Sequence, residues 1–167
     1  MVKRFVKLLK KILWILLVAL IVIQFFRPEK NISAEVSPAH ISQKFSVPDD
    51  VKQILSTSCY DCHSNNTHYP WYFSVQPVAW WLSGHIKEGR KHLNFDELSS
   101  YRLRRQFKKL EEIKKMVEEN EMPLSSYTLI HRDAALTPAQ IQTLVLWSEM
   151  QVNKMKSEYP ADSLLKK

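Results

Sequence analysis

The chain has 167 residues, the size of one ordinary domain with a short extension. Its net charge is +7, but most of the excess positive charge lies within the first eleven residues, so the charge gives little support for a nucleic-acid partner, and we expect none. Only two glycines are present, which disfavours a β-sandwich with many tight turns.

Residues 1–27 combine a basic start with an apolar run. Residues 1–11 contain five Lys or Arg and no acid, and 12–26 are apolar except for Gln24. This run is shorter than the ~17–25 residues of a spanning helix, but preceding apolar residues extend it and lysines can snorkel. It also suits a cleavable signal peptide, although the residues after the run include nothing small for a cleavage site until Ser33. We therefore expect an uncleaved transmembrane anchor, with the amino terminus in the cytoplasm and the rest outside.

Residues 28–47 show no sustained apolar period and contain two prolines and several serines, which predicts a linker with His40 exposed to solvent. A helical domain is predicted over 48–156. Its first helix is expected from Pro48 to Cys59, because a proline and then two aspartates mark a helix start.

This helix leads into the sequence Cys-Tyr-Asp-Cys-His at residues 59–63, the C-x-x-C-H pattern of a c-type haem attachment site. Residues three apart lie on one face of a helical turn, so Cys59 and Cys62 can both reach the vinyl groups on one porphyrin edge. His63 follows directly and can bind the iron from the proximal side. The pattern predicts one covalently attached haem c.

Three other interpretations of the two cysteines compete with haem attachment. A thioredoxin-like redox pair expects a βαβ setting, and no strand-rich stretch is visible. A zinc site of Cys59, Cys62, His63 and His68 departs from the usual ligand spacing. A plain disulfide would not need His63. Haem attachment is the interpretation we favour.

An aromatic block follows the motif at residues 69–73, and two more tryptophans lie at 80–81. Trp71 and Trp81 are candidates to wall the porphyrin, although aromatic residues pack in any core. A second helix is predicted from Pro77 to about Gly89, with His85 on its apolar side.

Two longer helices are predicted towards the carboxyl end. Apolar residues recur every three or four positions over 98–120, and Pro123 ends that pattern. The last helix is expected from Thr137 to about residue 155, with a capping box between Thr137 and Gln140. The polar tail, residues 157–167, is expected to fray.

Met122 is the favoured second axial ligand. The following Pro123 breaks the helix and places the thioether on a loop, although the alternative is a methionine that fills a gap in the core, as we expect for Met116. His85 is the rival, since an imidazole on that helix face could reach the iron. The other histidines and methionines are weaker candidates.

Together these segments resemble the small bacterial haem-binding-domain proteins, which are often membrane-anchored. The resemblance extends over about residues 45–150, and its matching pieces lie at 59–64, 69–72, 77–81, 85–90, 93–95, 121–123 and 136–137. It implies haem c attached by Cys59 and Cys62, with His63 as proximal ligand. The Met-Pro pair also resembles the distal loop of class I cytochromes c, although Leu124 stands where a second proline is expected.

The expected fold is therefore all-α, a small cytochrome c-like helical domain around one covalent haem after an amino-terminal anchor helix. We expect a single-pass protein of the bacterial inner membrane whose domain faces the periplasm. The favoured function is one-electron transfer with an unidentified redox partner protein rather than catalysis. The alternatives are a haem enzyme or sensor with a labile distal site and, further back, a metal-site or scaffold protein without haem.

Overall fold

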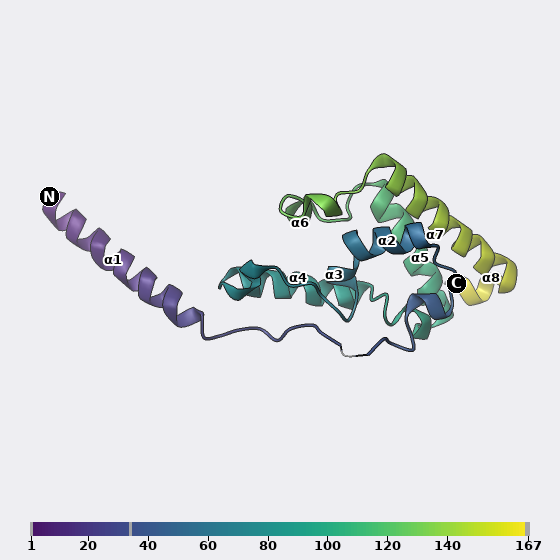
Figure 1. Cartoon of the computed structure of the whole chain (residues 1–167), viewed down its shortest axis with the longest axis horizontal. Helices are drawn as coiled ribbons and strands as arrows, with labels where there is room; N and C mark the ends of the chain where they lie inside the picture. The colour runs from purple at the N-terminus through teal and green to yellow at the C-terminus, as the bar shows by residue number, and fades with distance from the viewer. Residues whose placement is uncertain (1, 34, 166–167) are drawn as a thin grey trace.

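The computed structural model describes residues 2–33 and 35–165, and within these ranges every regular element is a helix (Figure 1). This confirms the all-α prediction. The α-helices are α1 (Val2–Ile23), α2 (Asp49–Ser58), α3 (Tyr60–His63), α4 (Val78–His92), α5 (Leu103–Glu118), α6 (Ser125–Thr128), α7 (Pro138–Glu158) and α8 (Ala161–Leu164). Short 3-10 helices are η1 (Ile41–Gln43), η2 (Trp71–Ser74), η3 (Leu98–Ser100) and η4 (Arg132–Ala134).

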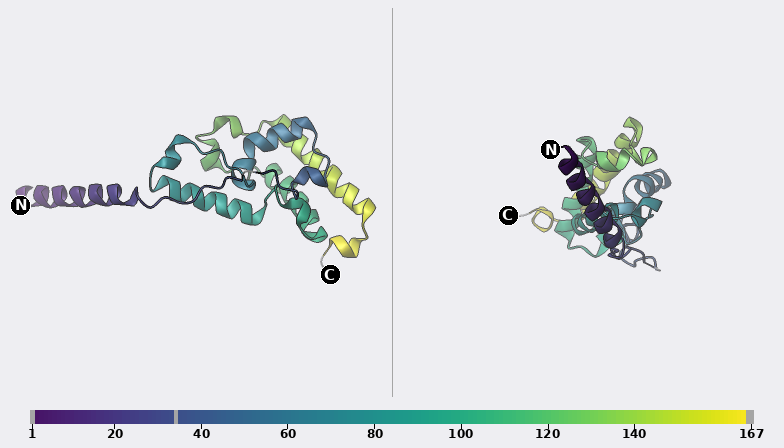
Figure 2. Two further views of the ribbon diagram at one scale, coloured as in Figure 1. Left: turned by 60° about the horizontal axis from the view of Figure 1, so that its bottom comes forward. Right: turned by 90° about the vertical axis from the view of Figure 1, so that its left-hand side faces the viewer.

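α1 extends away from the other helices as a separate rod (Figures 1 and 2). Among the described helices, α1 included, none has the length and apolar character to cross a membrane. Lys7, Lys10 and Lys11 lie within α1, and the helix ends at Ile23, so its uninterrupted apolar part is shorter than the predicted run. The prediction of a single-pass anchor in the inner membrane is therefore wrong.

Segment 28–47, predicted as a free linker, packs against the domain over much of its length. Ile41 and Phe45 are buried in the main core, and the Ile41 N–H donates to the Phe95 carbonyl at 2.8 Å. Further upstream, the Asn31 side chain donates to the Ser64 carbonyl and to the Thr67 hydroxyl. Two apolar residues around one short turn are too few to produce a periodic pattern, which is why the sequence indicated a spacer.

The main core lies between α2, α5 and α7, and α5 and α7 pack along one another. Phe107, Leu110, Ile113 and Val117 of α5 are all buried, as their spacing predicted. α7 begins with the predicted capping box, because the Gln140 N–H donates to the Thr137 hydroxyl and the Gln140 side chain accepts from the Thr137 N–H. These helices form one wall of the site described below.

The tail does not fray as expected over its described residues. α8 packs on α5, and the Leu164 side chain is buried in the main core. The Arg104 side chain also donates to the Asp162 carbonyl at 2.8 Å. One apolar residue in a polar stretch is enough to dock a single helical turn.

α5 ends in a Schellman motif that fixes the start of the next loop. Asn120 has φ 55°, its N–H donates to the Val117 carbonyl, and the N–H groups of Glu121 and Met122 both donate to the Met116 carbonyl. Asparagine tolerates this left-handed conformation better than most residues. The motif therefore holds the Met122 backbone against the last turn of α5.

Asn120→Ala is expected to lower the free energy of unfolding by about 1 kcal/mol, because alanine pays the steric cost of the left-handed conformation. Asn120→Gly should be neutral or slightly stabilising at the same position. Urea denaturation of the two variants measures the difference. Equal stability of both would show that the backbone conformation at Asn120 is not what ends α5.

Candidate functional site

A cavity of about 420 Å³ lies between α2, α3, α4, α5 and α7 and is lined mainly by apolar side chains. This volume is within the range of cofactor pockets. The predicted residues Cys59, Cys62, His63, His85 and Met122 all line it, although Met122 is far from the motif in sequence. The remaining apolar walls are formed by Leu55, Leu93, Phe95, Ile113, Val117, Leu124, Leu136 and Leu144.

α3 is the helical turn that presents both cysteines to the cavity. The Cys62 N–H and the His63 N–H both donate to the Cys59 carbonyl, at 3.2 and 3.0 Å. Both thiols are free. Burial raises the pKa of Cys59 to about 12 and that of Cys62 to about 11. Reactive thiol pairs need a lowered pKa, so these two buried thiols differ from a thioredoxin-like pair.

A backbone carbonyl of another segment fixes the orientation of the His63 ring. Its Nδ1 lies 2.9 Å from the Leu93 carbonyl, which can only accept, so Nδ1 carries the proton and Nε2 keeps its lone pair. Burial lowers the pKa of His63, so the neutral imidazole is favoured. A neutral ring with one nitrogen tied to a carbonyl is the usual arrangement of a metal-binding histidine.

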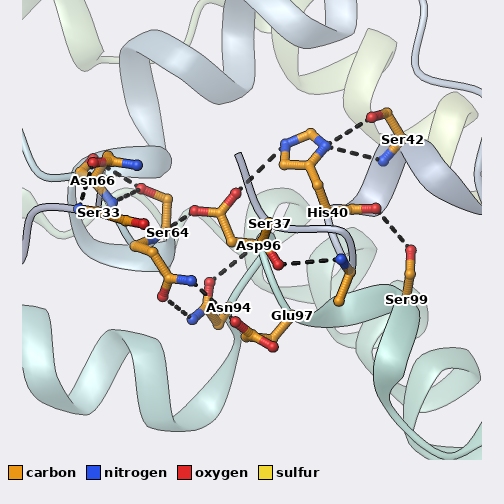
Figure 3. A network of polar contacts seen from close by, with 12 residues as sticks. Ser33, Ser37, His40, Ser42, Ser64, Asn66, Asn94, Asp96, Glu97 and Ser99 are labelled. Atoms are coloured by element: carbon orange, nitrogen blue, oxygen red, sulfur yellow. Dashed lines mark hydrogen bonds and ion pairs between the residues drawn. The ribbon is translucent and has the colours of Figure 1, made fainter. Parts of the chain in front are cut away.

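A polar network around Asn94 and Asp96 fixes the segment that supplies this carbonyl (Figure 3). The Asn65 N–H donates to the Asp96 carboxylate at 2.6 Å, and the Asn94 side chain donates to the Asn65 side-chain oxygen at 2.7 Å. His40 contacts Asp96 and accepts from the Ser42 N–H, so it is not the solvated residue that we expected. The network therefore holds residues 93–96 beside His63.

Met122 and His85 approach the cavity from different elements. Met122 follows the Schellman motif of α5, whereas His85 lies on α4 with its ring 4.4 Å from the Trp81 ring. Met116, which we expected only to fill the core, also lines the cavity. The structure therefore brings both candidate distal ligands to the site.

Trp71 and Trp81 are not among the residues that line the cavity, in contrast to their predicted role. Their side chains are 81% and 50% exposed. Trp81 shares a helix face with His85 but lies one turn nearer the start of α4, beyond the end of the cavity. The other aromatic residues of the block at 69–73 do not line the cavity either. Phe73, the buried member of this block, packs in a separate small cluster.

Two polar pairs at the cavity wall were not predicted from the sequence. The Tyr127 hydroxyl donates to the Asp61 carboxylate at 2.7 Å, and burial together with this bond raises the pKa of Tyr127. Lys109 forms an ion pair with Glu112. A single tyrosine on a loop has no spacing pattern, so only the position of Asp61 inside the motif could have pointed to this contact.

The predicted helix was expected to end at about Gly89, but α4 continues to His92. Gly89 lies within α4, at the point where that helix meets α3. A Cβ at this position would lie 2.6 Å from the Cys62 carbonyl oxygen and 3.2 Å from the Cys62 Cβ. The lack of a side chain therefore allows the second cysteine to approach α4. At Gly84, on the same helix, a Cβ would meet nothing within 4 Å.

Gly89→Ala is expected to destabilise the fold by about 1–3 kcal/mol and to displace α3, because the clash is with backbone. Gly84→Ala is the matched control and should gain about 0.5–1 kcal/mol from the better helix propensity. Thermal unfolding of both variants measures the contrast. Similar melting temperatures for the two would contradict the close approach of α3 and α4.

The alternative hypothesis of a zinc site has no support in the described part of the chain. Within residues 2–33 and 35–165, no group of three or more His, Cys, Asp or Glu is arranged to hold a metal ion. His68 is exposed and does not line the cavity. By contrast, a haem fits the donor set: two thiols on one turn, a neutral imidazole beside them, a thioether on another element and apolar walls between.

Comparison with protein families agrees with this geometry. The model of the family described as haem-binding domain matches residues 18–150, which cover most of the chain, from the end of α1 to the middle of α7. Searches of curated proteins and of solved structures found no match. The chain therefore belongs to the haem-binding domain family.

Proposed function

We propose that the protein is a c-type cytochrome-like electron carrier, with one haem attached through Cys59 and Cys62. His63 is the proximal ligand and Met122 the distal ligand. The haem iron, when bound, supplies reversible one-electron exchange. The chain carries electrons between redox partner proteins and catalyses no reaction itself.

The observation that carries the proposal is the meeting of both thiols, the imidazole and the thioether at one apolar cavity. The thiols stay protonated until they react, because burial raises the pKa of both. The Leu93 carbonyl fixes the orientation of the His63 ring through Nδ1, which would leave Nε2 as the nitrogen that binds the iron. Leu55, Ile113 and Val117 exclude water from the same space.

A carrier is favoured over a catalyst by the nature of the cavity wall. Among the described residues, three carboxylates line it: Asp61 accepts from Tyr127, Glu112 is paired with Lys109, and Glu88 is paired with Lys91. Each carboxylate thus has a partner in the protein itself, which supports a structural role rather than substrate chemistry. A thioether at the sixth position would also block access of small molecules to the iron.

The test uses the full chain produced together with haem c maturation machinery. We expect a reversible titration with a one-electron slope, and no spectral change when carbon monoxide is added to the reduced protein. Carbon monoxide binding or peroxide turnover by the unmutated protein would instead favour the enzyme or sensor. Absence of covalently bound haem would reject both functions.

A further inference from the structure

Residues 119–137, between α5 and α7, form the cavity wall that carries Met122. Among the described residues of this segment only Ala134 is buried, where η4 packs on α2. The large apolar side chains of Leu129 and Ile130 are 74% and 59% exposed. Apolar packing therefore holds the α6 part of the segment only weakly, and its position depends on polar contacts.

The first of these contacts joins α6 to the attachment motif. The Tyr127 hydroxyl donates to one carboxylate oxygen of Asp61, and the other oxygen accepts from the His68 N–H at 2.9 Å. The Asp61 carbonyl in turn accepts from the Thr67 hydroxyl at 2.7 Å. Asp61 is thus a fixed acceptor on α3, and a hydrogen bond to a carboxylate is stronger than a neutral one.

The second contact joins the same segment to η2. The His131 ring stacks on the Tyr127 ring, with centroids 4.4 Å apart and planes at 19°. Its Nε2 hydrogen-bonds with the Tyr72 hydroxyl. Tyr127 therefore stands between Asp61 and a stacked histidine that is itself tied to another element.

We propose that Tyr127 and Asp61 form a latch that holds the Met122 segment closed over the cavity. Leu124 is the N-cap of α6, so Met122 and Pro123 lead directly into the helix that carries Tyr127. Fixing α6 against α3 fixes the approach of Met122. Release of the latch frees the distal position for an external ligand. Tyr127 is thus a positioning residue, and this inference rests on the proposed role of Met122.

The test compares the haem-loaded full chain with its Tyr127→Phe variant, which loses only the donor hydroxyl. Loss of a hydrogen bond to a charged group should shift the opening equilibrium by about 10- to 100-fold. Amide hydrogen exchange over residues 120–135 should accelerate by that factor, and the reduced variant should bind carbon monoxide, which the unmutated protein should not. Asp61→Ala should reproduce the effect and add little in the Tyr127→Phe background.

Tyr159→Phe is the matched control, since it removes a hydroxyl from a residue that packs beside the main core and does not line the cavity. It should leave the exchange rate unchanged, and the reduced Tyr159→Phe variant should not bind carbon monoxide. If Tyr127→Phe cannot be isolated, Tyr72→Phe removes the outer bond and should accelerate exchange in the same segment. Unchanged exchange in residues 120–135, or acceleration spread equally over α5 and α7, would overturn the latch. If the unmutated protein lacks the absorption band of an iron–sulfur bond, Met122 is not the ligand. The exchange rates would still show whether Tyr127 and Asp61 hold the segment closed.

Discussion

Met122→Ala is expected to abolish the far-red absorption band that a bond between thioether sulfur and ferric iron produces. The reduction potential should fall by on the order of 100 mV, because a methionine ligand raises the potential of haem iron. The reduced variant should also bind carbon monoxide. Visible spectra of both redox states and a potentiometric titration measure these changes.

Met116→Ala is the matched control for this experiment. Met116 also lines the cavity, but it lies within α5 rather than on the loop that follows. This variant should keep the far-red band, and so should His85→Ala. A band that persists in Met122→Ala would reject the assignment of the distal ligand, and an effect of His85→Ala would point to the rival residue.

The second large effect is expected when both cysteines are removed. Cys59→Ala combined with Cys62→Ala should leave no haem on the polypeptide after denaturation, because each thiol is proposed to form one of the two thioether bonds. Either single variant should retain a haem through the remaining bond. Haem staining of denaturing gels measures the difference.

Tyr60→Phe is the control within the same turn. It keeps both thiols, and the hydroxyl that it removes is buried without a hydrogen-bond partner. Haem attachment should therefore be unaffected. Retention of covalent haem in the double cysteine variant would contradict the proposed attachment.

Local sequence signals predicted the elements that build the site. α2, α5 and α7 were predicted because apolar spacing and capping residues act within a few positions of the chain, and the capping box at Thr137 is formed as expected. The C-x-x-C-H motif is likewise local, so the placement of Cys59 and Cys62 on one turn followed from their spacing. Met122 was also predicted to approach them, from the Met-Pro pair, and it lines the same cavity.

Contacts between distant segments were the part that could not be predicted. Tyr127 and Asp61 are 66 residues apart, and neither has a sequence pattern that indicates the other. Ile41 and Phe45 gave no period from which burial could be inferred. The prediction of a membrane-spanning helix was wrong because it treated the lysines as flanking an apolar run. These lysines lie within α1 itself.

The most direct test of the covalent attachment is the intact mass of the full chain under denaturing conditions. When the chain is produced together with haem c maturation machinery, we expect its mass to increase by that of one haem. Without this machinery, the mass should be that of the polypeptide alone. A polypeptide of unmodified mass under both conditions would contradict the account.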